Sequence, residues 1–190
     1  MQHQHDNFAR RITRPVAINR RQRGNALAFT LLALVIGAIV IAAGVRQYQQ
    51  SERSASIQDV TAEVVQVIGE SKATFGQYAY VGMTTAQAVG GATIPRTRST
   101  SASTANNKFS GSITLEDNNA VTQGTAILTY ALVPQDQCTS IVIGSESLAR
   151  QVKVAGADVK PLDGTMNLAT LNAQCLSSNA VAVAWVIGRT

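Results

Sequence analysis

Two cysteines, Cys138 and Cys175, are the side chains of this 190-residue chain best suited to covalent chemistry. They stand 37 positions apart and form no CxxC motif, which disfavours a redox role. The two histidines, His3 and His5, lie close to the N-terminus, far in sequence from any cysteine that would need a base or a fellow metal ligand. In an oxidising compartment such a lone pair most simply forms a disulfide, which we favour over redox, nucleophilic or metal-binding chemistry.

Acidic side chains offer no evident catalytic pair. Glu116 and Asp117 are adjacent, but Asn118 and Asn119 follow them, and this composition is typical of a turn, with a cation site as the alternative. The sequence contains no phosphate-binding loop, no GxSxG motif and no HExxH motif. We therefore expect a structural or binding protein, not an enzyme, with no cofactor and no metal.

The N-terminal part of the chain is expected to enter a membrane. Residues 26–45 carry no charge, and as a helix rising about 1.5 Å per residue they would span about 30 Å, the thickness of a bilayer's hydrocarbon core. The first 24 residues hold six arginines and one aspartate, so this leader should stay cytoplasmic and the chain from Arg46 onward should be outside. The rest of the chain has ten basic and ten acidic residues, which argues against nucleic-acid binding.

We expect the helix to continue beyond the membrane as an amphipathic segment ending near Tyr80. Apolar residues recur there at intervals of three and four, while polar residues such as Glu63 fall on other faces. The apolar stripe consists of Ile57, Val60, Val64, Val67 or Ile68, Phe75 and Tyr78. It favours packing on the chain's own globular domain over a partner groove or a cofactor site.

The composition changes after Tyr80. Residues 81–111 are rich in Gly, Ser, Thr and Asn, which predicts a long surface loop. The expected strands are 112–115, 126–133, 151–154 and 180–187, the last almost wholly apolar and therefore central in its sheet. The expected short helices are 136–143, with Asp136 as its N-cap, and 168–176.

Together these elements predict an α+β fold, in which a long N-terminal helix, half apolar and half amphipathic, packs on a small antiparallel sheet. The expected division is a leader at 1–24, a hydrophobic helix at 25–53 and an exported globular domain at 54–190. Within that domain the two cysteines bound the region 138–175.

In this order the elements resemble a type IV pilin precursor, with a basic leader ending in Gly24, an uncleaved apolar helix, a spacer helix, a variable loop, a small sheet and two C-terminal cysteines. The long leader is similar to that of the type IVb pilins, the subclass that includes the toxin-coregulated pilin and bundlin. Three short segments also resemble that subclass: AAGV at 42–45, QDQCTS around Cys138 and LNAQC before Cys175. The resemblance covers nearly the whole chain.

The resemblance implies a maturation route. Prepilin peptidase would recognise Arg20, Arg21, Arg23 and Gly24, cleave before Asn25 and N-methylate that residue. The helix would then leave the inner membrane and pack with copies of itself in an extracellular filament, the pilus or fimbrium. Its filament-core residues would be Leu27, Phe29, Leu31, Leu34, Ile36, Ile39 and Ile41. Implied partners are further copies of the chain, the peptidase, the assembly machinery of the inner membrane, the membrane itself before assembly, and a host or partner-cell surface.

One position departs from the family pattern. The fifth residue after cleavage is normally Glu, thought to neutralise a neighbour's terminal amine, but here it is Phe29, and no acid occurs between Gly24 and Glu52. Alignment on the AGV segment shifts the frame by one and yields Thr30. Three interpretations stay open: the major subunit of a filament for adhesion, aggregation or conjugative contact; a minor or initiating pilin or pseudopilin; and a single-pass anchored envelope protein that keeps its leader.

Overall fold

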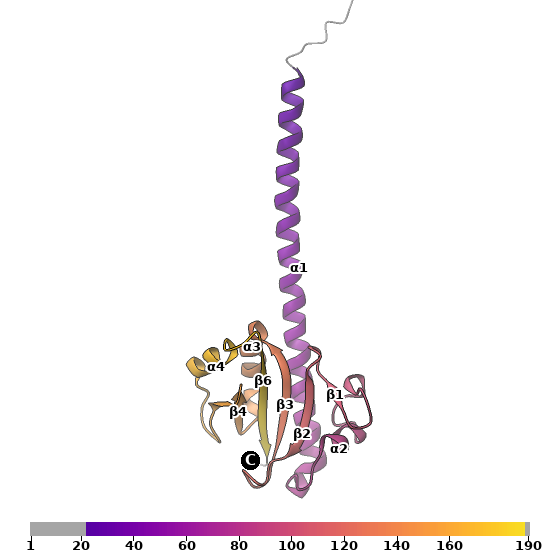
Figure 1. Cartoon of the computed structure of the whole chain (residues 1–190), viewed down its shortest axis with the longest axis vertical. Coiled ribbons are helices and arrows are strands. Elements are labelled where there is room, and N and C mark those ends of the chain that lie inside the picture. Colours follow the sequence, from indigo (N-terminus) through magenta and orange to yellow (C-terminus); the bar gives the residue numbers. More distant parts are fainter. Residues whose placement is uncertain (1–21, 189–190) are drawn as a thin grey trace, which may run out of the picture. The chain divides into compact units, whose positions relative to one another are not determined.

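The longest element, α1, runs from Gln22 to Phe75. A computed structural model describes residues 22–188, the first five of them by their backbone alone. Internal contacts divide the chain into two units, one reaching to Tyr48 and one beginning at Gln49 (Figure 1). Because α1 belongs to both units, its portions on either side of this boundary are described separately.

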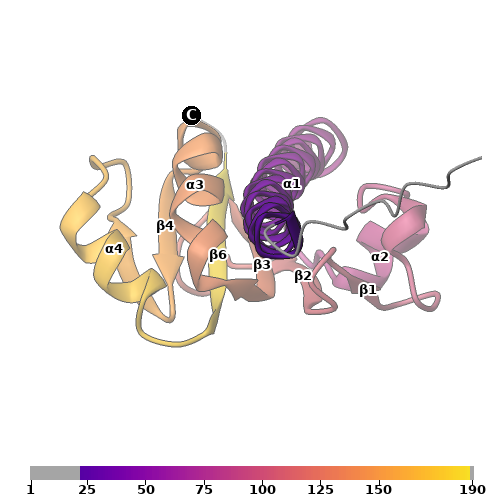
Figure 2. The same cartoon turned by 90° about the horizontal axis from the view of Figure 1, so that it is seen from above.

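The second unit is built on a six-stranded sheet in the order β1-β2-β3-β6-β4-β5, with every neighbouring pair antiparallel. The strands are β1 (Ala105–Asn106), β2 (Ser112–Asp117), β3 (Thr125–Pro134), β4 (Gln151–Val154), β5 (Ala157–Lys160) and β6 (Ala180–Gly188). β6 lies between β3 and β4, the central place that its apolar composition predicts (Figure 2). The predicted α+β class, with a long helix on an antiparallel sheet, is confirmed.

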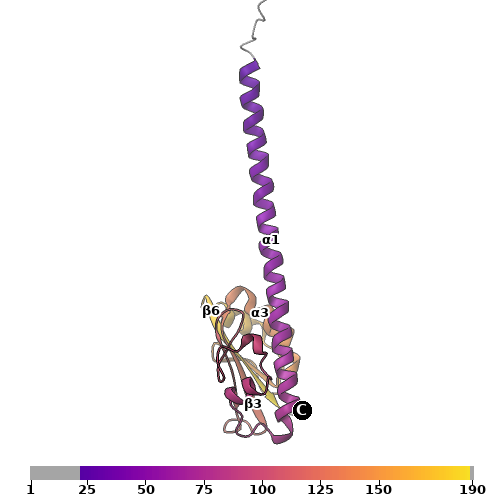
Figure 3. The same ribbon diagram turned by 90° about the vertical axis from the view of Figure 1, so that its right-hand side faces the viewer.

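Helices cover this sheet. Residues 49–75 of α1 lie along one face, as Figure 3 shows, and α3 (Gln135–Ser145) packs beside them. α4 (Leu168–Cys175) contacts α3, β4 and β5. The shorter elements are α2 (Thr85–Gly90) and three turns of 3₁₀ helix, η1 (Gly76–Tyr78), η2 (Arg96–Arg98) and η3 (Glu146–Leu148).

The amphipathic part of α1 buries a narrower stripe than its sequence predicts. Val60, Val64, Val67 and Ile68 are fully buried in one core cluster with the sheet residues, while Ile57 and Phe75 are partly buried against it. Tyr78 was wrongly placed in this stripe, since its side chain is 74% exposed. The helix ends at Phe75, and Ala79 and Tyr80 take positive φ values of 51° and 59°. The chain therefore turns early, and Tyr80 is buried in place of Tyr78.

A β-bulge changes the face that β3 presents to the core. The register of β3 against β6 shifts between Tyr130 and Val133, and Leu132 lies within the shift with a φ of 55°. Strict alternation groups Leu132 with Leu128 and Tyr130, but the bulge turns Leu132 outward and brings Val133 into the core. The strand predicted at 126–133 thus alternates between the core and the outer face only up to Tyr130.

The segment 81–111 is not the single surface loop that its composition predicts, because it contains α2, η2 and β1. α2 starts with a capping box, in which the Thr84 hydroxyl accepts a hydrogen bond from the Gln87 amide and the Gln87 side chain accepts one from the Thr84 amide. Met83, Val89 and Ile94 are buried in the main core. A few well-spaced apolar side chains thus anchor a segment that is polar on average.

Asp136 is not the N-cap of α3. The helix starts at Gln135, its cap residue is Pro134, and no side chain accepts a hydrogen bond at that end. Asp136 instead lies in the first turn, where a carboxylate complements the helix dipole, and forms an ion pair with Arg53 of α1 at 2.7 Å. The Asp136 carboxylate therefore links α3 to α1 and does not cap α3.

Candidate functional site

The apolar half of α1 exposes its large side chains on every face. Each of the predicted filament-core residues is more than half exposed, up to 69% for Phe29 and Leu34. They are Leu27, Phe29, Leu31, Leu34, Ile36, Ile39 and Ile41. Among the described residues, one helix is long and apolar enough to cross a membrane, and this segment lies in it. A helix that is apolar all round is stable only when lipid or other helices cover it.

Thr30 is a polar residue within this apolar segment, and its side chain forms a hydrogen bond within α1. The Thr30 hydroxyl donates a hydrogen bond to the Leu27 carbonyl at 2.9 Å. Phe29 precedes it and is fully apolar. Whichever of these two residues occupies the position where the resemblance implies an acid, the position presents no negative charge.

The predicted processing site is only partly within the described residues. Arg20 and Arg21 of the predicted recognition set lie outside them, as do His3, His5 and most of the leader. Arg23, Gly24 and Asn25 belong to the backbone of α1. Cleavage after Gly24 and methylation of Asn25 stay predictions.

Cys138 and Cys175 form the predicted disulfide, which links α3 to the last residue of α4. Both cysteines are fully buried, and their Cα atoms are 5.7 Å apart. The closed loop includes β4 and β5 and stabilises the fold by about 3–4 kcal/mol in the chain-entropy model. The bridge thus ties a helix on the face of the sheet to the region at one edge.

A buried polar cluster, which sequence analysis missed, joins α1, η2 and β3. Glu63, assigned to an outward face, is only 8% exposed. Its carboxylate accepts hydrogen bonds from Arg98 Nε at 2.6 Å and from the Tyr130 hydroxyl at 2.9 Å. Burial raises the pKa of Tyr130 well above its ordinary value, and the charge of Glu63 adds to the rise, so the phenol stays protonated and donates.

A second ion pair lies one turn earlier on α1. Asp59 pairs with Lys108 at 2.8 Å. Asp59 and Glu63 are four residues apart and hence on the same side of the helix, and both receive cations from the segment 81–111. We call Asp59, Glu63, Arg98 and Lys108 the charge clamp. The i, i+4 spacing of the two acids was the signal in the sequence, although nothing there identified their partners.

The Asp117 turn is a hydrogen-bonded junction. The Asp117 carboxylate accepts hydrogen bonds from the backbone amides of Gly82 and Asn119, each at 2.7 Å. These hydrogen bonds lower the pKa of Asp117, the one from Asn119 most strongly. Among the described residues no three potential metal ligands lie together, and this carboxylate is committed to N–H donors. The turn therefore fastens the start of the segment 81–111 to the end of β2.

Comparisons with known proteins identify a family and two similar solved structures. Residues 54–188 match a family model described as PilS N terminal. Among solved structures, the chain is similar to a type IV b pilin from Salmonella typhi, with 16% identity, a TM-score of 0.49 and coverage of 67% of this chain and 99% of that one. It is also similar to TcpA, a type IV pilin from Vibrio cholerae El Tor biotype, with 12% identity, a TM-score of 0.48 and coverage of 72% and 99%. Comparison with curated proteins gives no match. Since the family match spans most of the chain, the protein belongs to the PilS family.

Proposed function

We propose that this PilS-family protein is a type IVb pilin that is inserted in the inner membrane as a precursor, cleaved after Gly24 by prepilin peptidase, N-methylated on Asn25 and polymerised into an extracellular pilus. The role is structural and not catalytic. The pilus would serve adhesion, aggregation or conjugative contact with another cell.

The observation that carries this proposal is the exposed apolar surface of residues 27–45. In the membrane, lipid covers these side chains. Once the helix leaves the membrane, an equally apolar environment must replace the lipid, and identical helices from other copies of the chain provide it. The filament core would therefore consist of the residues that formed the membrane anchor.

The direct test is the intact mass and N-terminal sequence of protein sheared from cells that carry the native peptidase. We expect a chain that begins at Asn25, bears one added methyl group and lacks the two hydrogens lost in the disulfide. Protein found only in membranes and still beginning at Met1 would rule out the proposal and favour an anchored envelope protein.

A matched pair of variants tests the cleavage site itself. Gly24→Leu puts a bulky side chain at the scissile bond and should leave full-length precursor in the membrane. Gly37→Leu, in the same helix at a position where an added Cβ would meet no atom within 4 Å, is the control and should be processed normally. Normal processing of Gly24→Leu would disprove this cleavage site.

A minor or initiating pilin is the second candidate, and the uncharged position at Phe29 favours it. A subunit at the filament tip needs no acid to neutralise the terminal amine of the subunit it would otherwise meet. Quantitative mass spectrometry of sheared filaments distinguishes the two. A major subunit would dominate the filament protein, whereas a minor one would be a small fraction of it.

A further inference from the structure

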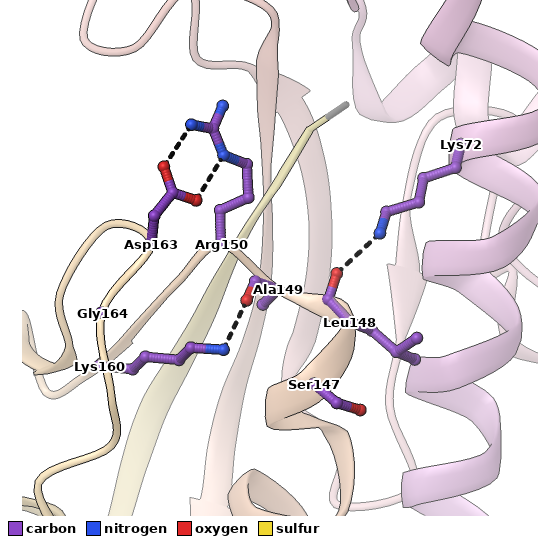
Figure 4. A pocket seen from close by; sticks show the side chains of 8 residues that line it. All are labelled: Lys72, Ser147, Leu148, Ala149, Arg150, Lys160, Asp163 and Gly164. Carbon is purple, nitrogen blue, oxygen red and sulfur yellow. Dashed lines mark hydrogen bonds and ion pairs between the residues drawn. The ribbon is translucent and has the colours of Figure 1, made fainter. Parts of the chain in front are cut away.

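A cleft in the second unit gathers basic side chains from three separate parts of the fold. It has a volume of about 200 Å³ and is lined by residues of α1, η3, the two residues before β4, the end of β5 and the loop after β5. Figure 4 shows the eight lining residues: Lys72, Ser147, Leu148, Ala149, Arg150, Lys160, Asp163 and Gly164. Three of them are cationic and one is anionic.

The anionic residue is already neutralised. Asp163 accepts two hydrogen bonds from Arg150, from Nε at 2.9 Å and from Nη2 at 2.5 Å. This bidentate geometry commits the carboxylate to the guanidinium, and the pKa of Asp163 is accordingly lowered. The two lysines of the cleft are left without that carboxylate as a close partner.

Lys72 and Lys160 reach the cleft from opposite sides and bond only to backbone carbonyls. Lys72 Nζ donates to the Leu148 carbonyl at 2.9 Å. Lys160 Nζ donates to the carbonyls of Glu146 and Ala149 at 2.7 and 2.9 Å. Within residues 22–188 neither ammonium forms an ion pair, whereas the nearby Lys153 pairs with Asp158.

The hydrogen bonds to backbone carbonyls do not use all the N–H donors of Lys72 and Lys160. Lysines at the end of a helix often bond to its last carbonyls, and these lysines do so for α3 and η3. Yet both side chains are partly buried, and burial lowers the pKa of Lys72 below its ordinary value because the charged form has lost water. Each ammonium has three N–H donors, so Lys72 retains two and Lys160 one for a further acceptor.

We propose that this cleft binds an oxyanion, a carboxylate or a phosphate group, through the remaining N–H donors of its two lysines, Lys72 and Lys160. The exposed Ser147 lies in the same lining and supplies a hydroxyl donor. The volume of about 200 Å³ equals about seven water molecules at about 30 Å³ each, enough for such a group and part of the sugar or ester that carries it. The recognised group is therefore a small oxyanion, whether a sugar carboxylate or a phosphate carries it, and binding does not require the chain to polymerise.

The test is a titration of the full-length chain in a neutral detergent at constant ionic strength. Sodium glucuronate represents the sugar carboxylate, and inorganic phosphate represents the phosphate group. Saturable shifts of the backbone amide resonances of Ser147, Ala149 and Gly164 are expected with at least one of them. A response to glucuronate alone assigns an acidic sugar, and a response to phosphate alone assigns a phosphate group.

Variants that remove single charges test whether the two lysines bind the anion. Lys72→Gln and Lys160→Gln keep an N–H donor but lose the charge, and each should weaken binding about tenfold. Lys153→Gln, outside the cleft lining, is the matched control and should bind as the wild type does. Asp163→Asn removes the cleft's carboxylate and should tighten binding several-fold, a gain that misfolding cannot produce. Absence of saturation with both anions, or unchanged binding in both lysine variants, would overturn the site.

Discussion

At the scale of single residues, Glu63 shows how a buried charge can be stabilised. A carboxylate with little exposure is costly unless its oxygens are paired and hydrogen-bonded. Here Arg98 compensates the charge, and Tyr130 provides a neutral donor to the other oxygen. The ring of Tyr130 also packs edge-on against Trp185, with ring centroids 5.7 Å apart. The cluster thus connects α1 to the centre of the sheet.

We predict that Glu63→Leu destabilises the protein by about 2–3 kcal/mol, because it leaves Arg98 without its partner in a partly exposed setting. Tyr130→Phe keeps the contact with Trp185 and should cost about 1–2 kcal/mol for the lost hydrogen bond. Denaturant unfolding followed by tryptophan fluorescence measures both. Asp59→Ala, which breaks the exposed pair of the charge clamp, is the control and should have a clearly smaller effect. Equal effects of Asp59→Ala and Glu63→Leu would contradict a special role for the buried carboxylate.

Asp117 makes a contribution that depends on pH. Its folded-state pKa is lowered, so the ionised carboxylate stabilises the fold above its ordinary pKa of 3.8, and this stabilisation is lost as pH falls through the folded-state value. Asp117→Asn keeps the shape but does not titrate. The variant should therefore be less stable than wild type at pH 7, with the difference vanishing at low pH.

Unfolding of the two proteins side by side from pH 7 to pH 2 measures this difference. Comparison with the variant is needed because Asp59 and Asp163 also have lowered pKa values and give the whole protein an acid dependence. A difference that stays constant with pH would show that the carboxylate contributes only through its shape.

At the scale of elements, the segment 81–111 is held at several points along its length. Asp117 holds Gly82, the capping box starts α2, and the two ion pairs of the charge clamp hold Arg98 and Lys108 to α1. Surface loops of this composition are usually mobile and variable. This one is attached by a few buried apolar residues together with these polar and charged contacts, which is why its average composition misjudged it.

The sequence predicted those elements whose pattern is local. Ala180 to Gly188 is apolar along its whole length and Gln151 to Val154 alternates, and both are strands. β1 escaped prediction because it has only two residues, and β5 because Val159 is its one large apolar side chain. Both pair with a neighbouring strand, β1 with β2 and β5 with β4. The functional residues were likewise predictable only in part. The apolar half of α1 and the cysteine pair were evident in the sequence, whereas Lys72 and Lys160 come to line one cleft only after folding.

The α3–α4 pair depends on its disulfide. Cys138→Ser or Cys175→Ser should cost about 2–5 kcal/mol, because the open chain gains conformational entropy when unfolded and the core receives a hydroxyl in place of buried sulfur. We expect either loss of the protein from cells or faster proteolysis between residues 138 and 175. Limited proteolysis with mass mapping checks this. Wild-type resistance in both variants would mean that the bridge is dispensable.

At the scale of the whole molecule, the chain combines two units with opposite solvent requirements. Residues 27–45 expose apolar side chains, whereas the unit from Gln49 onward has its own core and a mixed, nearly neutral surface. We predict that residues 49–190 produced alone form a soluble, folded monomer, whereas the full-length chain needs detergent. Size-exclusion chromatography with light scattering measures this. A fragment that self-associates as strongly as the full-length chain would contradict the assignment of self-association to the apolar half.

The position of β6 also sets the order in which the protein can mature. β1, β2 and β3 form one block of the sheet, β4 and β5 form another, and only β6 hydrogen-bonds to both. Yet β6 comes last of the six strands in the sequence. Until it pairs, the two blocks expose unpaired edges, and the hydrophobic side chains that pack around Trp185 remain uncovered. The sheet is therefore open to association with other copies of the chain in the interval before β6 joins its two blocks, wherever in the cell the globular domain folds.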